Sequence, residues 1–420
     1  MHGFRTSGFF GPNYRSFYSP PLHVASAQGA VITADDGTEY LDAYNNVPVV
    51  GHSNPAVAVA VHTALTRANT HTRYADATVD AYADKLGALM PGGLGRLIFT
   101  CSGSEANDLA LQIARNATGK TGVIVTDGAY HGTTTTAAAI SPSLIGLDSI
   151  PDWVETVPVP NLASSTFDAE LAASVAQAAA KLDQRGHGAA ALVLDSAFTS
   201  DGILAGTSTF SPGRDQPQTS AANPTLTQTA AAIRQAGGLF IADEVQAGFC
   251  RTGTWWAISA LGVEPDLLTM GKPMANGLPL AGLAGRADLI DAFGSKQRYF
   301  NTFAAGPAVC AAGAAVLDEL DRIGMPERIG QLEEELLGHL AQALGASRRS
   351  ITVRTFGLMI GIDLSAADVT GADIKQRMYE NGVLVGTTGP GGNTLKLRPP
   401  LAITSGQHER IANVLAGTLA

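Results

Sequence analysis

Asp266-Leu-Leu-Thr-Met-Gly-Lys-Pro-Met-Ala-Asn-Gly277 is the stretch that decides the fold of this chain. Its apolar run is typical of a buried strand, and the glycine turn that follows presents one lysine, Lys272. An earlier apolar run, Phe240-Ile-Ala-Asp243, closes with an aspartate that we expect to be buried. The sequence therefore predicts two buried strands, each ending beside a charged side chain.

Other short apolar runs lie along the chain and alternate with helical, alanine-rich segments. The five runs are Arg96 to Thr100, Gly122 to Thr126, Ala189 to Leu194, Gly238 to Ala242 and Asp266 to Met270. This alternation predicts an α/β fold, because parallel strands need helical crossovers that cover both faces of the sheet. We therefore expect a large domain built on a mainly parallel sheet.

The rest of the chain predicts a smaller α/β domain. The patterns are helices at 308–320 and 327–344, strands at 350–356 and 358–363, and a hairpin around an Asp-Gly turn at 31–42. We predict that residues 1–53 contribute to the small domain, that 54–306 form the large domain and that 307–420 complete the small one. The Ser/Thr/Pro/Gln-rich stretch from Thr207 to Asn223 is expected to be a surface loop.

The composition predicts a folded protein that acts on small molecules. The 420 residues are 45% hydrophobic, which is ample for a packed core, and the formal net charge is −10. An acidic chain without a dense Lys/Arg run has no electrostatic footprint for nucleic acid or an anionic membrane. No segment approaches about 18 uninterrupted apolar residues, so we expect no membrane span.

Cysteine usage and the N-terminus predict a cytoplasmic location. Cys101, Cys250 and Cys310 lie far apart, are odd in number and form no CxxC pair, which disfavours a disulfide framework and a zinc site. The stretch Met1-His-Gly-Phe-Arg-Thr-Ser-Gly8 has no apolar run of the kind found in signal peptides, so we expect no secretion. We expect a reducing compartment and no bound metal.

Lys272 and Asp243 together indicate a particular kind of cofactor. A lysine amine can hold an aldehyde as a Schiff base, and a carboxylate can keep a pyridine nitrogen protonated so that the ring accepts electrons. Both demands point to pyridoxal 5′-phosphate. Val245 would then lie under the ring and Gln246 would hydrogen-bond its phenolic oxygen. Helix capping is the alternative for Asp243, and Arg251 is expected to be structural or to lie at the entrance.

Two further segments follow predicted strands and supply groups that such a cofactor needs. Ser102, Gly103 and Ser104 precede a helix, where backbone N–H groups bind phosphate well, although an ordinary N-cap is the alternative. Tyr130 could stack on a planar ring or pack in the core. His131 is either part of the cofactor site or a hydrogen-bonded turn residue.

Six motifs resemble the class III pyridoxal-phosphate aminotransferases in order and rough spacing. They are Ser102-Gly-Ser-Glu-Ala-Asn107, Tyr130-His-Gly132, Asp243-Glu-Val-Gln-Ala-Gly248, Met270-Gly-Lys-Pro273, Phe300-Asn-Thr-Phe303 and Leu397-Arg-Pro-Pro400. The resemblance implies a fold type I homodimer, with a sheet of the seven-stranded type and active sites at the subunit interface. The roles it implies are Schiff-base lysine and proton shuttle for Lys272, pyridinium partner for Asp243, phosphate cup for Gly103 and Ser104, stacking ring for Tyr130, and contact with the partner subunit's cofactor phosphate for Thr302.

Within that family the chain looks most like phospho-lyases that act on phosphoethanolamine or phosphohydroxylysine. The residues that carry this likeness are Tyr44-Asn-Asn-Val47, Gly51-His52, Asn69 to Tyr74, Ser104 to Leu111 and Gly389-Pro390. We expect Asn46, Arg73 and Arg398 to line the substrate pocket. Arg398 offers a planar fork suited to a carboxylate, although an ion pair with Asp or Glu is the alternative.

The chain also departs from the patterns of its family. Ala304-Ala-Gly306 and Leu278 stand where the phospho-lyases usually carry permissive or polar groups. Asp195-Ser196 stands where many transaminases have Glu-Pro. The first departure weakens the case for a phosphorylated substrate, and the second weakens the case for a simple transaminase.

Three functions therefore stay open. The first is a lyase that expels phosphate or a thiolate from an amine or amino acid after removal of the Cα proton. The second is an aminotransferase that passes the amino group to a keto acid. Both need the same base and electron sink, so the cofactor residues do not separate them. The third, a regulator that binds the cofactor without catalysis, is disfavoured by the retention of Lys272 and Asp243.

Overall fold

The large sheet has seven strands and positions most of the site. A computed structural model of the chain describes residues 9–160, 164–204, 208–211, 218–219, 225–345, 347 and 349–420. Across the sheet the order is β4 (Arg96–Thr100), β12 (Ala281–Gly285), β11 (Leu267–Met270), β10 (Leu239–Asp243), β7 (Ala189–Asp195), β5 (Gly122–Thr126) and β6 (Val154–Val157). Strand β12 runs antiparallel to both of its neighbours, and the pairings among β11, β10, β7, β5 and β6 are parallel. The predicted mainly parallel sheet and its five predicted strands are confirmed.

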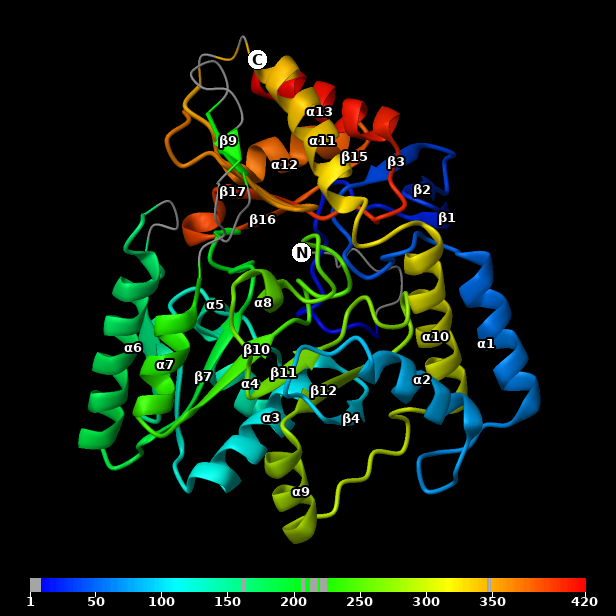
Figure 1. Ribbon diagram of the computed structural model, residues 1–420. Coiled ribbons are helices and arrows are strands. Elements are labelled where there is room, and N and C mark those ends of the chain that lie inside the picture. The colour runs from blue at the N-terminus through cyan, green and yellow to red at the C-terminus, as the bar shows by residue number, and fades with distance from the viewer. Residues whose placement is uncertain are drawn as a thin grey trace.

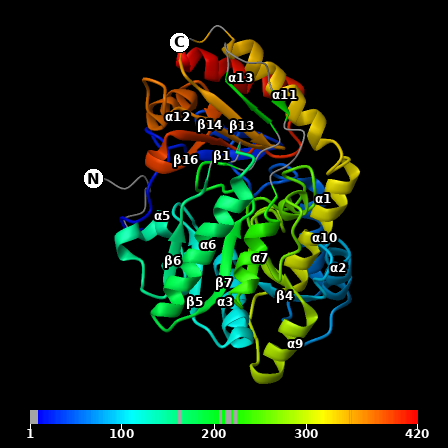
Figure 2. The ribbon, with the colours of Figure 1, turned by 60° about the vertical axis from the view of Figure 1, so that its left-hand side comes forward.

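Helices cover both faces of this sheet (Figure 1, Figure 2). Alternate residues of the strands enter two separate cores, one on each face. On one face, Ile113 of α3 (Gly103–Thr118) packs with Val193 and Ile241. On the other face, α6 (Phe167–Gln184) and α7 (Thr227–Gln235) pack over residues such as Leu192 and Phe240. A strand with both faces covered is apolar throughout, which is why the short apolar runs could be found in the sequence.

Two smaller sheets lie above the large one (Figure 2). The first has the order β1 (Val24–Gln28), β2 (Val31–Ala34), β3 (Glu39–Asp42) and β15 (Val383–Leu384). The second has the order β16 (Gly386–Thr388), β17 (Thr394–Leu397), β14 (Met359–Asp363), β13 (Thr352–Phe356), β8 (Ser208–Phe210) and β9 (Gln218–Thr219). Because β3 pairs with β15, the N-terminal strands share a sheet with the C-terminal part of the chain. The domain limits at 53 and 306 stay a prediction.

The expected surface loop between Thr207 and Asn223 is wrong in part. Strand β8 pairs antiparallel with β13, and Ser208 and Phe210 are buried there. Residues 207, 212–217 and 220–223 of that stretch lie outside the described part of the chain. Pairing with a distant strand gave this polar segment a structure that its local composition does not signal.

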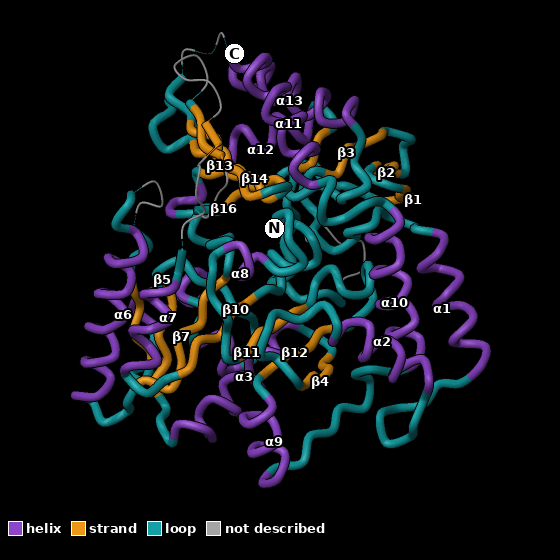
Figure 3. Tube along the Cα trace, in the orientation of Figure 1, coloured by secondary structure: helices purple, strands orange, loops and turns teal. Residues whose placement is uncertain are grey.

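The remaining helices connect the sheets and cover the small ones. They are α1 (Pro55–Arg67), α2 (Ala77–Gly87), α4 (Thr135–Ala139), α5 (Pro142–Ile145), η1 (Leu147–Ser149), α8 (Ala257–Ala260), α9 (Ala287–Lys296), α10 (Pro307–Arg322), α11 (Ile329–Leu344), α12 (Gly371–Glu380), η2 (Pro390–Gly392) and α13 (Ser405–Leu419). Much of the region between the upper and lower sheets is loop (Figure 3). No helix in the described part of the chain is long and apolar enough to cross a membrane.

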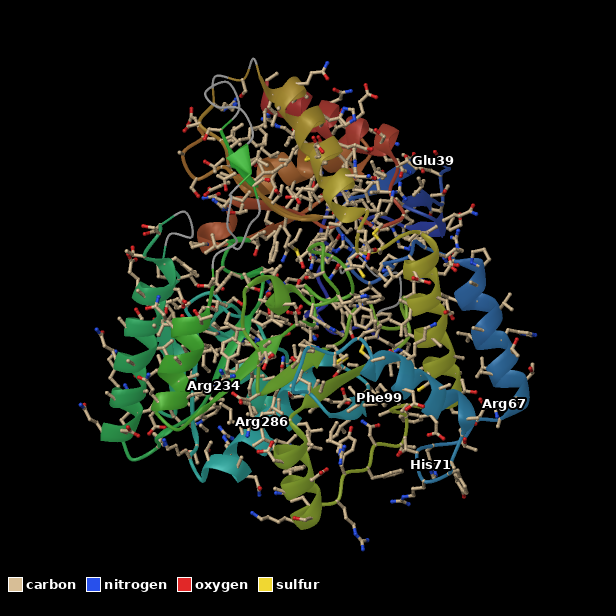
Figure 4. All side chains as sticks on the ribbon, viewed as in Figure 1. Glu39, Arg67, His71, Phe99, Arg234 and Arg286 are labelled. Carbon is tan, nitrogen blue, oxygen red and sulfur yellow. The ribbon has the colours of Figure 1, made fainter. Side chains whose placement is uncertain are left out.

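Asp266, the first residue of the decisive stretch, fastens the end of the large sheet that lies away from Lys272. Its buried carboxylate accepts hydrogen bonds from Arg234 (3.1 Å), Arg286 (2.9 Å) and the backbone N–H of Phe240 (2.9 Å). Both arginines lie near the lower ends of β10 and β11 (Figure 4). The carboxylate thus joins these two strands to the helix and loop beside them.

We expect Asp266→Ala to lower the free energy of unfolding by about 3 kcal/mol, because it strands buried donors and removes the counter-charge of two arginines. Chemical denaturation of the protein measures this change. Asp291→Ala is the matched control, since Asp291 pairs with Arg96 on the surface, where both side chains are more than half exposed. That control should change stability by less than about 1 kcal/mol, and equal losses in the two variants would contradict the prediction.

Candidate active site

The carboxyl ends of the large sheet's strands meet around one cavity of about 340 Å³. Such an edge is where ligands bind in open α/β sheets. Nine of the residues predicted for the site line the cavity. The residues lining it include Ser102, Gly103, Ser104, Asn107, Tyr130, His131, Asp243, Val245, Gln246, Lys272 and Leu278. The structure thus brings together segments that lie up to 170 positions apart in the sequence, from Ser102 to Lys272.

Lys272 follows β11 directly and projects into this cavity. Burial lowers the pKa of its ammonium group, and the positive charge of Arg398 lowers it further, while Asp243 and Asp195 act in the opposite direction. A lower pKa leaves more of the amine neutral near pH 7. The neutral amine is the form that can attack an aldehyde or accept a proton.

Asp243 closes β10 and is held as an anion by its surroundings. Burial alone would raise the pKa of its carboxyl group, but hydrogen bonds from His131, Val245 and Asn107 outweigh burial and lower the pKa. Oδ2 lies 2.7 Å from Nδ1 of His131 and accepts from Nδ2 of Asn107 at 2.9 Å, while Oδ1 accepts from the N–H of Val245 at 3.0 Å. A carboxylate offers about four acceptor positions, so one remains for a ligand N–H.

Ser102, Gly103 and Ser104 form the loop that opens α3. Ser102 is the N-cap, and its hydroxyl accepts from the N–H of Glu105 at 3.3 Å, so the capping alternative also holds. Two glycines keep this corner open. A Cβ on Gly103 would lie 2.9 Å from Val245, and one on Gly132, whose φ is +139°, would lie 2.4 Å from the Ser104 hydroxyl. The free N–H groups at the start of a 16-residue helix suit an anion.

Tyr130, Val245 and Gln246 form walls of the same cavity. The Tyr130 ring is 36% exposed and therefore does not pack in the core, which was the alternative for it. Gln246 is buried, and its side-chain oxygen accepts a hydrogen bond from Arg398. His131 is buried against Asp243, with Nε2 unpaired among the described atoms. Because His131 contacts Asp243, we favour a role in the cofactor site over the alternative that it is only a hydrogen-bonded turn residue.

Asn46 and Arg398 lie next to Gln246, and both are buried. Nδ2 of Asn46 donates to the Gln246 carbonyl at 2.6 Å. The Arg398 guanidinium lies 4.9 Å from the Tyr44 ring centroid, and it forms no ion pair with a carboxylate in the described part of the chain. The Asp or Glu partner considered for Arg398 is thus not found there, and its Nε is unpaired.

Arg73 and Thr302 lie outside this cavity in the single chain. Both are exposed, and the Arg73 guanidinium stacks on the Phe300 ring at 3.8 Å from its centroid. His71, two residues before Arg73, lies on a peripheral loop in Figure 4. One chain alone therefore does not bring these two residues to the site, and the predicted contact between Thr302 and the partner subunit's cofactor stays a prediction.

Three site residues were missed as functional residues by the sequence analysis. Asn107 lies inside α3 and donates to Asp243. Asp195 pairs in register with Asp243, and burial followed by the charge of Asp243 raises the pKa of its carboxyl group. Lys396 on β17 is mostly buried, and its ammonium has no hydrogen bond or ion pair with any described residue. The strand position of Asp195 could have revealed it, because it ends an apolar run as Asp243 does.

The residues of the cavity fit pyridoxal 5′-phosphate. The glycine-lined corner at the start of α3 would hold its phosphate, Asp243 has an acceptor position for the ring N–H, and Lys272 supplies an amine of lowered pKa. Val245 and Tyr130 offer apolar and aromatic surfaces for the ring. The phosphate, the ring, its nitrogen and the aldehyde of the cofactor would therefore each meet a residue of suitable chemistry.

Known proteins resemble this chain along nearly all of its length. The family described as Aminotransferase class-III matches residues 14–419. An alanine–glyoxylate aminotransferase 2-like protein of Drosophila melanogaster is 33% identical over 92% of this chain and 80% of its own length. An ethanolamine-phosphate phospho-lyase homolog of Caenorhabditis elegans is 32% identical, over 94% and 88% of the two chains.

One solved structure is also similar. A phospholyase from Arthrobacter, in complex with phosphoethanolamine, is 38% identical over 97% of both chains, with a TM-score of 0.88. The fold, the match over almost the whole chain and the fit of the cavity to the cofactor agree. The chain belongs to the class III aminotransferases, a family of enzymes that depend on pyridoxal 5′-phosphate.

Proposed function

We propose that this enzyme is a lyase that eliminates phosphate from an amino-alcohol phosphate such as phosphoethanolamine. The observation that carries the proposal is a pair of cations, Lys396 and Arg398, that forms no ion pair with a carboxylate in the described part of the chain. Arg398 reaches the cofactor cavity through its hydrogen bond to Gln246, which lines it. The likeness to the Arthrobacter phospholyase supports the same substrate class.

Lys396 lies on β17, which ends at Leu397, and Arg398 follows that strand directly, two positions after Lys396. Gly361 and Gly386 flank Lys396 in register on β14 and β16, so no side chain covers it from either neighbouring strand. Burial and then the positive charge of Arg398 lower the pKa of Lys396 to about 7, so the charges of the two side chains repel each other.

The charge of the substrate decides between the candidate reactions. A phosphate monoester carries about −1.5 to −2 at pH 7, whereas a carboxylate carries a single charge. Two adjacent cations match the phosphate and exceed what one carboxylate needs. Arg398 alone would suffice for an amino acid or a keto acid.

The residues around the cavity can then divide the work of the reaction. When bound, the cofactor supplies an electron sink for the substrate carbon that loses its proton. The Lys272 amine, kept partly neutral by burial, takes that proton. Asp243 stays ionised, supported by His131 and Asn107. Lys396 and Arg398 hold the phosphate as the C–O bond breaks, and hydrolysis then yields a carbonyl compound and ammonia.

A single-turnover assay tests this proposal. The holoenzyme is mixed with phosphoethanolamine, phosphohydroxylysine, a cysteine S-conjugate or a simple ω-amine, while the cofactor spectrum and released phosphate, thiol and ammonia are followed. Phosphate and ammonia in equal amounts, without a keto acid, are the expected result. Formation of the amine form of the cofactor, reversed only by a keto acid, would refute the proposal.

Aminotransfer is the second candidate. The planar fork of Arg398 suits a carboxylate, and a relative at 33% identity is named an alanine–glyoxylate aminotransferase 2-like protein. The same assay decides between the two reactions, because only transfer to a keto acid leaves nitrogen on the acceptor.

We also propose that two copies of the chain form a dimer that shares residues between sites. Tyr74 (64% exposed) and Phe300 (40%) both contact His71, and Phe300 also stacks on Arg73. Phe303 (76% exposed) follows Thr302 in the sequence, and so much exposed aromatic surface is unusual on a monomer. Light scattering of the holoenzyme tests the dimer. A monomeric and fully active enzyme would contradict shared sites.

The affinity for the phosphorylated substrate should fall as the pH rises through about 7. Lys396 is a cation below its pKa of about 7 and neutral above it, so it binds phosphate well only below about pH 7. A bound phosphate dianion raises the pKa of Lys396, because it stabilises the charged form. We expect Lys396→Met to raise KM for phosphoethanolamine roughly tenfold at pH 6.5 and to flatten its rise with pH.

Two variants control this experiment. Lys396→Arg should keep the affinity and lose the pH dependence, because a guanidinium stays charged throughout. Lys375→Met removes another half-buried lysine, which belongs to α12 and lies near the rings of Phe17 and Tyr18. This variant should leave KM unchanged. The assignment of Lys396 is wrong if Lys396→Met and Lys375→Met behave alike.

A further inference from the structure

Arg251 lies in the loop that follows Asp243, and its side chain is 0% exposed. Its guanidinium reaches across to the upper sheets, where Nη1 donates to the carbonyl oxygens of Leu358, at 3.3 Å, and Pro399. Nε and Nη2 have no partner among the described atoms. Burial and the charge of nearby Arg398 lower the pKa of Arg251 to about 9. A buried cation held beside another cation is costly, which suggests that the position serves the site. Because Arg251 is fully buried and bonded to backbone carbonyls, the entrance alternative for it is wrong and the structural alternative holds.

The backbone around Arg251 is also fixed from both sides. The N–H of Leu358 donates to the Arg251 carbonyl at 3.0 Å. Gly357 allows this close approach, since its φ is +58° and a Cβ there would lie 2.6 Å from the same oxygen. Phe249 and Cys250, just before Arg251, have φ values of 62° and 68°, which are rare for such residues. The loop is thus held in one conformation that directs Arg251 toward Pro399.

Few hydrogen bonds fix the segment that carries Arg398. The N–H of Arg398 donates to Ala43 at 2.7 Å, and that of Leu401 donates to Val49 at 2.8 Å. Pro399 and Pro400 between them have no N–H to donate. The bond from Arg251 to the Pro399 carbonyl therefore supplies a restraint that the segment itself lacks.

Arg398 is consequently held at both ends by one loop of the large domain. Its guanidinium donates to the side chain of Gln246, and the carbonyl of the next residue, Pro399, accepts from Arg251. Gln246 and Arg251 are five positions apart in the loop after Asp243. One loop thus both lines the cofactor cavity, through Gln246, and holds Arg398 in place.

We propose that Arg251 is a positioning residue that sets Arg398 relative to Gln246 and the cofactor cavity. This inference rests on Arg398 binding the anionic group of the substrate, as proposed above. Without Arg251, Pro399 loses its restraint and Arg398 can move away from the cavity. Substrate anions would then bind more weakly, while the residues that hold the cofactor keep their places.

The test compares Arg251→Met with Arg354→Met in the holoenzyme. Arg354 is a matched control: it too joins the parts of the chain by donating to backbone carbonyls, of Gly202 and Ile203 at 3.2 Å each, but it has no bond to residues 398–401. Binding of inorganic phosphate and of propionate is followed through the cofactor absorbance, and KM and kcat are measured with phosphoethanolamine.

We expect Arg251→Met to weaken anion binding and raise KM roughly tenfold, with kcat and the absorbance of the bound cofactor little changed. Arg251→Lys should recover part of the affinity, since one ammonium can still reach the Pro399 carbonyl. Arg354→Met should keep the affinity for both anions even if it melts earlier.

Unchanged anion affinity in folded Arg251→Met, or an equal loss in Arg354→Met, would overturn the proposal. If Arg251→Met does not fold, Arg251→Gln is tested in its place, and the same changes in anion affinity and KM are expected of it. A wild-type enzyme that binds propionate and not phosphate would refute the phospho-lyase proposal alone, because Arg251→Met should then still weaken propionate binding.

Discussion

Replacing Lys272 by alanine should abolish turnover and leave the cofactor bound without a covalent link. The amine of Lys272 is the nucleophile of lowered pKa that lines the cavity, and the proposed mechanism uses it again to take the proton from the substrate. Loss of a general base alone costs about 10² to 10⁴ in rate, so we expect kcat to fall by roughly four orders of magnitude.

Borohydride reduction followed by mass spectrometry of the intact chain measures the covalent link. The wild-type enzyme should gain the mass of the reduced cofactor, and Lys272→Ala should not. Lys120→Ala is the control, because Lys120 is partly buried, donates to the Ala236 carbonyl and lies before β5, at the opposite end of the sheet. A reducible adduct at full occupancy in Lys272→Ala would show that another lysine holds the cofactor.

The sequence predicted those parts of the fold whose residues signal their own conformation. Strand β7, Ala-Ala-Ala-Leu-Val-Leu-Asp, is an apolar run covered on both faces and could be found locally. Strand β12, Ala-Gly-Leu-Ala-Gly, has no β-branched or aromatic residue and could not be. It becomes a strand because it fits between β4 and β11, where Gly282 passes so close to the Ile98 carbonyl that a Cβ would lie 2.8 Å from it.

The candidate site divides in the same way. Lys272 and Asp243 could be predicted because each ends a recognisable strand, and such ends meet at one edge of a parallel sheet. Lys396 could not be predicted, because Thr-Leu-Lys-Leu alternates between polar and apolar residues. This alternation is typical of a strand with one face in water, and it predicts an exposed lysine. Only the tertiary structure brings that lysine within electrostatic reach of Arg398, Asp195 and Lys272. Asn107 likewise resembles one more polar position on a helix until α3 is placed against β10.

Replacing Asp243 by asparagine should leave the cofactor bound but slow turnover by roughly 10² to 10³, the usual cost of removing one group that stabilises developing charge. The carboxylate is the group placed to keep the ring nitrogen protonated, and its lowered pKa shows that its surroundings favour the charged form. An amide of the same size keeps the shape of the site and removes that charge. Rates from the single-turnover assay, with bound cofactor measured by absorbance, test this expectation.

Asp195→Asn is the informative comparison, because Asp195 lies beside Asp243 in register but bonds to the N–H groups of its own loop, Ala197 at 3.0 Å and Thr199 at 3.1 Å. Burial and the charge of Asp243 raise its pKa, so its surroundings do not favour an anion as those of Asp243 do. If negative charge in general helped the reaction, the two variants would be equally slow. If the charge must lie at the ring nitrogen, Asp243→Asn should be at least about tenfold slower than Asp195→Asn, since only Asp243 has His131 and Asn107 to hold its charge in place. Turnover in Asp243→Asn close to that of the wild type would remove Asp243 from the proposed mechanism.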